Sequence, residues 1–168
     1  CGMMRRFRTF SSKKTKSLGA RLARRILREQ KAESRGALVI GLTGPLGAGK
    51  TTFVQGFFRG MGVRTAPRSP TFVILRRTSL KKPKRGNLFH VDAYRLGRAR
   101  DLETLKFREV VRDPENIVLV EWGERVRGVL PRTTLWVQFE HGRTAEERVV
   151  TFLGHGRKKP TRKRTPSY

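Results

Sequence analysis

The pattern of hydrophobic and polar positions along the chain predicts alternating helices and strands. Residues 15–31 and 51–61 carry apolar side chains at helical spacing, which predicts two amphipathic helices. Residues 37–42 and 116–121 are nearly uninterrupted apolar runs, typical of strands that are covered on both faces. Residues 87–92 predict a further strand, and residues 101–111 a further helix.

Two antiparallel pairings complete the expected fold. We expect residues 67–71 to form a loop, with a strand beginning at residue 72 and a basic hairpin tip at residues 81–86. Residues 134–140 and 147–153 predict a closing antiparallel pair. We divide the chain into a basic, disordered N-terminal extension (1–14), one domain (15–153) and a basic, disordered tail (154–168).

Composition limits the class of protein. A chain of 168 residues is long enough for one domain, it has a single Cys, and it contains no apolar run of membrane-spanning length. Its formal net charge of +26 is concentrated at both ends and in one loop, residues 76–85. Such segments attract polyanions such as RNA or anionic membranes, or they serve only as solubilising tails. The basic start also has the composition of an organelle transit peptide.

One glycine-rich segment predicts a binding site. The sequence Gly44-Pro-Leu-Gly-Ala-Gly-Lys50-Thr51 follows a predicted buried strand and opens a predicted helix, which is the context of a phosphate-binding loop (P-loop). Glycines allow backbone N–H groups to surround phosphate oxygens, and the helix directs its positive end toward them. In this motif the lysine contacts the β- and γ-phosphates and the following hydroxyl binds Mg²⁺. The segment therefore predicts binding of a nucleoside triphosphate with Mg²⁺.

Two carboxylates are candidates for the remaining chemistry. Asp92 and Glu121 each close a hydrophobic strand, where a magnesium ligand or a residue that orients the attacking water is expected. Spacing alone does not assign the two roles. Ser69-Pro70-Thr71 lies where many P-loop proteins have a loop that senses the γ-phosphate. Trp122 is a candidate to pack over the site or to serve a partner surface, and no guanine-reading [NT]-K-x-D motif is present.

Taken together, these motifs resemble the TsaE family, the bacterial ATPases needed for the N6-threonylcarbamoyladenosine (t6A) modification of tRNA. The resemblance covers roughly residues 15–153. It rests on five features: Thr15-x-x-Leu-Gly in the first helix, the glycine-rich loop, Ser69-Pro-Thr-Phe, His90-Val-Asp-Ala-Tyr-Arg-Leu96 and Glu121-Trp122. The basic residues 81–85 and both basic ends depart from the family's pattern.

The resemblance implies an α/β, P-loop NTPase-like three-layer fold with a mixed parallel and antiparallel sheet. It implies a cytoplasmic ATPase, weak alone, that acts with TsaB and TsaD and meets tRNA through that complex, with no membrane role. Thr51 and Glu121 would bind Mg²⁺, Asp92 would be essential to hydrolysis, and Ser69, Pro70 and Thr71 would form the nucleotide-responsive loop. ATP would be bound by Gly44, Leu46, Gly47, Ala48, Gly49, Lys50, Thr51 and Thr52, with Thr15 and Arg143 near the base.

Two other functions remain open from the residues alone. A P-loop kinase acting on a small molecule would transfer phosphate to an added metabolite rather than to water. An RNA-binding protein on a P-loop scaffold would bind RNA in a salt-sensitive manner without hydrolysis.

Overall fold

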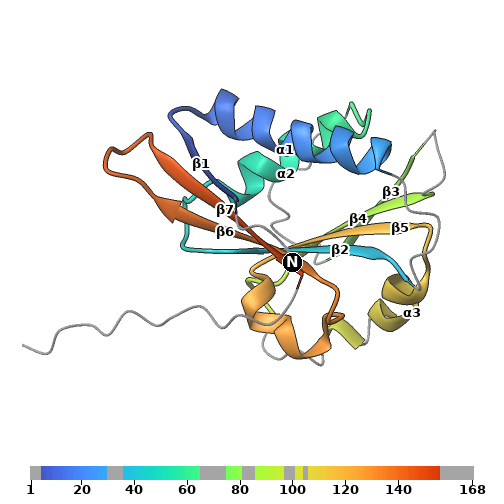
Figure 1. Ribbon diagram of the computed structural model, residues 1–168. Coiled ribbons are helices and arrows are strands. Elements are labelled where there is room, and N and C mark those ends of the chain that lie inside the picture. The colour runs from blue at the N-terminus through green and yellow to red at the C-terminus, as the bar shows by residue number, and fades with distance from the viewer. Residues whose placement is uncertain are drawn as a thin grey trace, which may run out of the picture.

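The computed structural model of the protein describes residues 5–29, 36–64, 75–80, 86–96, 101–103 and 106–155. Within these residues, seven strands form one mixed sheet in the order β1-β7-β6-β2-β5-β4-β3 (Figure 1). The strands are β1 (Arg5–Thr9), β2 (Leu38–Thr43), β3 (Leu75–Ser79), β4 (Asn87–Asp92), β5 (Asn116–Glu121), β6 (Leu135–His141) and β7 (Arg148–His155). The helices are α1 (Ser12–Arg28), α2 (Lys50–Gly60), α3 (Phe107–Arg112) and the 3₁₀ helix η2 (Gly123–Val129).

The centre of the sheet is parallel and its edges are antiparallel. Strand β2 pairs in parallel with β5 and β6, and β5 pairs in parallel with β4. The pairs β3–β4, β6–β7 and β1–β7 are antiparallel. The expected α/β fold with a mixed sheet is therefore confirmed. The carboxyl ends of the parallel strands meet at one edge of the sheet, where ligands usually bind in such folds.

Helices cover both faces of the sheet and make three layers (Figure 1). The helices α1 and α2 bury one core, which includes Phe53, Phe57 and Phe139. On the opposite face, α3 and η2 cover a second core around Phe107 and Val126. Because the central strands are buried on both faces, their side chains are apolar at nearly every position, as the uninterrupted runs predicted.

A close approach at a glycine fixes the pairing of the two helices on the first face. A Cβ on Gly56 of α2 would collide with the backbone carbonyl oxygen of Lys16 in α1. No larger residue fits this contact unless the helices move apart. The contact places the start of α1 beside α2, and α2 leads directly from the glycine-rich loop.

The predicted disorder of residues 1–14 is wrong for the part that the structure describes. Residues Arg5–Thr9 form β1, which pairs with β7, and α1 already begins at Ser12. Phe7 packs edge-on against Phe152, and Arg8 lies 3.3 Å from the carboxylate of Glu147. Three arginines made the composition polar, but the alternation of exposed and covered positions is that of an edge strand.

Two other boundaries differ from the expectation. The predicted helix at 101–111 is not a single helix: residues 101–103 form a 3₁₀ turn, Lys106 adopts a left-handed conformation (φ 54°), and α3 begins only after Lys106. Strand β7 continues to His155, past the predicted start of the tail at residue 154. The predicted switch loop, the hairpin tip at 81–85 and the tail beyond residue 155 lie outside the described residues. No helix in the described part of the chain has the length and apolarity to cross a membrane.

Candidate functional site

The glycine-rich loop connects the end of β2 to the start of α2. Gly44, Gly47 and Gly49 all have positive φ angles, of 132°, 71° and 96°. A side chain at Gly44 would also collide with the carbonyl oxygen of Phe139 on the neighbouring strand. The loop therefore requires glycine at these points, and it is wrapped tightly around the end of the sheet.

The N-terminus of α2 points into this loop without a side-chain cap. Its cap is Gly49, no side chain accepts a hydrogen bond there, and the first turn of the helix contains no acidic residue. The first N–H groups of a helix lack intrahelical acceptors and carry the positive end of its dipole. The backbone donors of this turn are thus directed at a place where an anion is favoured.

Lys50 is folded back onto the loop. Its Nζ donates hydrogen bonds of 2.7 Å to the carbonyl oxygens of Gly44 and Pro45 and lies 3.8 Å from the ring centroid of Trp122. Burial lowers the pKa of the Lys50 ammonium, and the nearby carboxylates of Glu121, Glu124 and Asp92 oppose that shift. The Lys50 ammonium is buried and is held by neutral acceptors and an aromatic ring. Its interaction energy therefore becomes more favourable when a negatively charged phosphate binds beside it.

Trp122 takes a backbone conformation that is rare for a bulky side chain. It has φ 58°, at the junction between β5 and η2. This turn places the indole over Lys50 and beside the ring of Tyr94, whose centroid is 5.0 Å away. The local conformation therefore places two aromatic side chains, Trp122 and Tyr94, beside the glycine-rich loop.

A chain of hydrogen bonds runs from the core to α2. Thr51 Oγ1 donates to Glu121 Oε2 over 2.8 Å, and the other oxygen of Glu121 lies 2.9 Å from His90 Nε2. Both His90 and Glu121 are buried. An ionised carboxylate only accepts hydrogen bonds, so with Glu121 ionised the proton of His90 is on Nε2. The carboxylate is held from both sides and faces the start of α2.

Asp92 lies directly beside Glu121, because their strands are parallel and the two residues are paired in register. Its Oδ1 accepts a hydrogen bond of 3.0 Å from the backbone N–H of Tyr94. Both carboxylates line a cavity of about 210 Å³, together with Leu46, Gly47, Gly49, Lys50, Thr51, Thr52, Tyr94 and Trp122. Oxygen ligands, a cation and helix N–H groups thus share one cavity, which is the donor set that a magnesium-bound polyphosphate requires.

Three further expected site residues, Ala48, Thr15 and Arg143, are not among the residues that line this cavity. Ala48 is fully buried. Thr15 is buried beside Gly49, and its hydroxyl is 2.7 Å from that of Thr9. Arg143 is exposed on the turn between β6 and β7, where its backbone N–H donates to Glu147. Ser69, Pro70 and Thr71 lie outside the described residues.

Sequence reasoning missed three side chains that contact the loop. His141 Nε2 lies 3.1 Å from the carbonyl oxygen of Leu46, and Arg148 Nε donates to that of Gly47 over 3.1 Å. Both come from the β6–β7 hairpin, and only the order of the strands in the sheet reveals that they lie near the loop. The third residue is Glu124.

Glu124 lies in η2, and its carboxyl group is near Gly44 and Lys50 of the glycine-rich loop. Its carboxylate lies near the backbone N–H of Gly44, and among the described residues its buried Oε2 has no hydrogen-bond partner. Burial raises the pKa of this carboxyl group, while nearby backbone N–H groups and the cations Lys50 and Arg125 oppose the shift. The sequence signal for Glu124 is its spacing: it comes three residues after Glu121, so one helical turn would bring the two residues to the same side.

Comparison with known proteins agrees with this geometry. The family model "Threonylcarbamoyl adenosine biosynthesis protein TsaE" matches residues 9–150. The chain belongs to the TsaE family. The matched range contains every residue that lines the cavity, and the resemblance to the TsaE family suggested by the loop, Ser69-Pro-Thr, His90-x-Asp92 and Glu121-Trp122 is confirmed.

Individual TsaE proteins are similar over most of the chain. The "tRNA threonylcarbamoyladenosine biosynthesis protein TsaE" of Streptomyces coelicolor is 39% identical over 148 residues, which are 84% of this chain and 90% of that protein. The Bacillus subtilis protein with the same description is 35% identical over 120 residues, 70% of each chain. The crystal structure of Bacillus subtilis YdiB matches with a TM-score of 0.67 at 28% identity, over 92% of this chain and 87% of that one.

Proposed function

We propose that this TsaE-family chain is a Mg²⁺-dependent ATPase required for the t6A modification of tRNA, acting in the cytoplasm with homologues of TsaB and TsaD. The observation that carries the proposal is the hydrogen bond of 2.8 Å between Thr51 and Glu121, immediately beneath the glycine-rich loop. It joins the first turn of α2 to the end of a central strand, where a hydroxyl and a carboxylate can face one metal ion.

The phosphates of ATP fit the loop, since backbone N–H groups and the α2 dipole favour anions there. Lys50 needs only to exchange the carbonyl oxygens of Gly44 and Pro45 for phosphate oxygens. The exchange is favourable because the phosphate oxygens carry negative charge, whereas the carbonyl oxygens are neutral acceptors.

Mg²⁺ fits the residues present. Thr51 Oγ1 and Glu121 Oε2 are hard oxygen donors in contact with each other, and two protein ligands with phosphate and water suffice for this ion. When bound, the ion neutralises charge on the phosphates. In this role His90 keeps the Glu121 carboxylate oriented toward Thr51.

Asp92 is the proposed hydrolytic residue. It lies beside the metal ligand Glu121 in register, lines the same cavity, and is held by the backbone N–H of Tyr94 through one oxygen. The other oxygen is then available to orient a water toward the γ-phosphate. Thr15 and Arg143 are assigned near the base and Ser69 to Thr71 to the responsive loop by family resemblance alone.

The test is an ATPase and tRNA-modification assay with and without TsaB and TsaD. We expect weak hydrolysis alone, stimulation by the two proteins, and loss of activity with EDTA. Asp92→Asn should retain ATP binding and reduce stimulated turnover by on the order of 10²-fold or more. Full turnover in Asp92→Asn contradicts the assigned role. Phosphate transfer to an added metabolite would instead identify a small-molecule kinase, and RNA binding without hydrolysis would identify an RNA-binding scaffold.

A further inference from the structure

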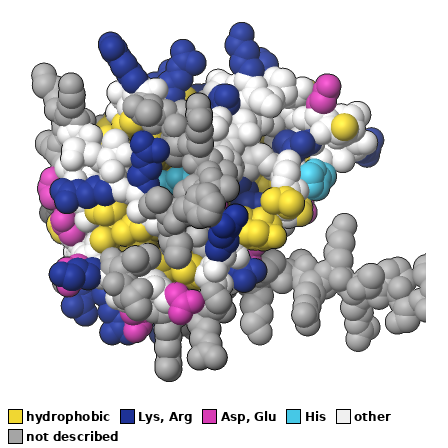
Figure 2. All heavy atoms as spheres, turned by 180° about the vertical axis from the view of Figure 1, so that it is seen from behind, with side chains coloured by type: hydrophobic (Ala, Val, Ile, Leu, Met, Phe, Trp, Pro, Cys, Tyr) yellow, Lys and Arg dark blue, Asp and Glu magenta, His cyan; other side chains and the backbone are white. Residues whose placement is uncertain are grey.

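The outer face of helix α1, in the layer formed by α1 and α2, is strongly basic. Helix α1 and its C-cap carry seven Lys or Arg residues against the single acid Glu29. The seven are Lys13, Lys14, Lys16, Arg21, Arg24, Arg25 and Arg28, and all are exposed. Figure 2 shows Lys and Arg side chains along the side of the molecule that α1 occupies in Figure 1. Within the described residues, only Arg25 in this group forms an ion pair, with Glu29.

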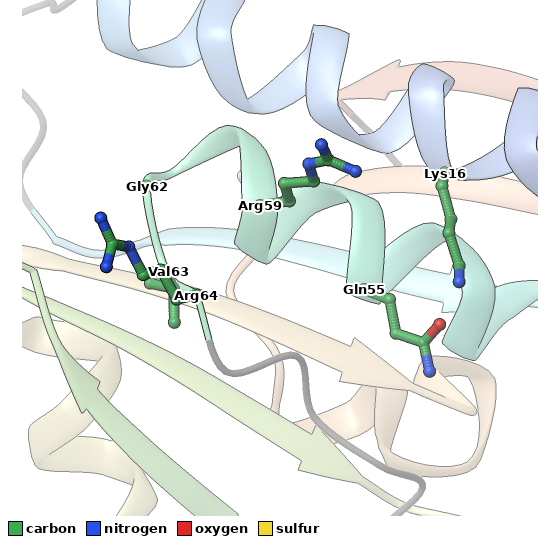
Figure 3. A pocket seen from close by; sticks show the side chains of 6 residues that line it. All are labelled: Lys16, Gln55, Arg59, Gly62, Val63 and Arg64. Atoms are coloured by element: carbon green, nitrogen blue, oxygen red, sulfur yellow. The ribbon is translucent and has the colours of Figure 1, made fainter.

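A groove extends this basic face onto α2. It has a volume of about 550 Å³ and is lined by Lys16, Gln55, Arg59, Gly62, Val63 and Arg64. In Figure 3 Lys16 projects from α1 toward α2, and Arg59 and Arg64 come from α2 and the segment after it. Lys16, which lines the groove, is also the residue of α1 whose backbone lies against Gly56 of α2. Among the described residues that line it, three are cations and none is an acid.

The opposite layer lacks this character. Helix α3 carries Arg108, Glu109 and Arg112, and the Arg108 guanidinium pairs with Glu103 at 2.6 Å. The charges on that side are mixed. The basic face is therefore a property of one layer rather than of the whole surface. It also lies apart from the ATP cavity, with which the groove shares no lining residue.

A phosphate backbone fits this face better than a lipid surface does. A helix that lies on a membrane inserts a free apolar face. The apolar side of α1, including Leu18 and Ala23, is instead packed in the core against α2. Of the large hydrophobic side chains exposed in the described residues, only Phe10 lies next to α1. By contrast, a row of exposed cations about 22 Å long, from Lys13 to Arg28 at 1.5 Å per residue, can follow successive phosphates.

We propose that the face formed by α1 and the α1–α2 groove binds the phosphate backbone of RNA directly. The choice of RNA as the polyanion rests on the proposed function in tRNA modification. The binding itself needs neither ATP nor a partner protein. The contacts are electrostatic, so the affinity depends on salt and only weakly on sequence.

The test compares two charge-matched variants of the full chain. Lys16→Gln/Arg59→Gln removes two charges from the groove, and Arg112→Gln/Arg132→Gln removes two exposed charges from the opposite layer. Binding to a fluorescent tRNA transcript is measured by anisotropy over a range of KCl concentrations without nucleotide. For the groove variant we expect weaker binding, and a slope of log K against log salt that falls by about 2. The control variant should retain the wild-type slope.

Three results would overturn the proposal. They are the absence of tRNA binding by the wild-type chain, an equal loss in both variants, and binding to phosphatidylglycerol vesicles in place of tRNA. ATP affinity, measured on the same samples, should be unchanged in the groove variant. The tRNA-binding measurement contains no ATP, TsaB or TsaD. A chain without ATPase activity could therefore still bind tRNA, and an active ATPase could fail to bind it, so the two proposals fail separately.

Discussion

His90 Nε2 lies 2.9 Å from Glu121 Oε1 inside the protein, and this contact fixes the carboxylate whose other oxygen meets Thr51. Among the described residues, none forms a hydrogen bond with the second, buried ring nitrogen of His90. In that part of the chain, the hydrogen bond to Glu121 is therefore the one that orients the imidazole. A residue on one central strand thereby orients a functional group on the next strand.

Replacing His90 should separate this orienting role from simple packing. His90→Leu leaves Glu121 Oε1 buried and unpaired, which costs about 1–3 kcal/mol of stability. It should also weaken Mg²⁺-dependent ATP binding. His90→Gln, whose amide can reach the same oxygen, should retain more of both. Thermal unfolding and ATP titrations with and without Mg²⁺ provide the measurements. Equal Mg²⁺ dependence in folded His90→Leu and the wild type would contradict the orienting role.

Trp122 should report nucleotide binding by fluorescence. Lys50 Nζ lies 3.8 Å from its ring centroid, and we expect the ammonium to move to the phosphates when ATP binds. Loss of that cation changes the environment of the indole. The emission change on adding Mg²⁺-ATP should persist in Trp136→Phe and vanish in Trp122→Phe. A change that follows Trp136 instead would show that the contact with Lys50 is not the one affected.

Adding one methyl group at the contact between α1 and α2 should lower the stability of the protein. Gly56→Ala would improve helix propensity, yet its Cβ collides with the Lys16 carbonyl oxygen. Overpacking of this kind costs about 1–3 kcal/mol, so we expect a lower free energy of unfolding in urea. Gly128→Ala is the matched control, since a Cβ there meets nothing within 4 Å. Equal stabilities of the two variants would disprove the close approach.

Glu124 should make stability depend on pH. Burial raises its pKa in the folded protein above the ordinary value of 4.5, against the opposing effects of Lys50 and Arg125. The folded state therefore holds this proton more tightly than the unfolded chain does. Its contribution to stability is greatest below the ordinary pKa and is lost as the pH rises through the raised value.

The comparison that isolates this effect is Glu124→Gln. The glutamine side chain keeps the shape of the glutamate, but it carries no charge to bury. We expect the variant to lose less stability than the wild type as the pH is raised from about 4.5 to 7. Parallel curves of unfolding free energy against pH would show that the pKa of Glu124 is not raised.

Much of the fold was predictable because its signals are local. The apolar runs that became β2 and β5 could only be strands covered on both faces, and the glycine-rich loop between β2 and α2 carries its own pattern. Asp92 and Glu121 could be recognised as candidates because each closes a hydrophobic strand, whereas their pairing in register comes from the structure. Such features depend on neighbouring residues and on general rules of sheet geometry.

What escaped prediction depends on long-range pairing. Strand β1 was not predicted because its three arginines make the segment polar, and it forms by pairing with β7. The spacing of apolar residues predicted a continuous helix through Lys106, where the structure has a left-handed residue. The contact of His90 with Glu121 requires the register of β4 and β5. The approach of His141 to the loop requires the strand order of the sheet. Neither register nor strand order can be read from one segment of sequence.

Equilibrium binding of a fluorescent ATP analogue decides whether the glycine-rich loop binds ATP with Mg²⁺. We expect saturable binding by the wild type, weaker binding with EDTA, and a roughly 10- to 100-fold loss of affinity in Lys50→Ala, because the lysine's charge-assisted hydrogen bonds are worth about 1.5–3 kcal/mol. Wild-type affinity in a folded Lys50→Ala protein, or affinity unaffected by removing Mg²⁺, would show that the loop is not the binding site for Mg²⁺-ATP.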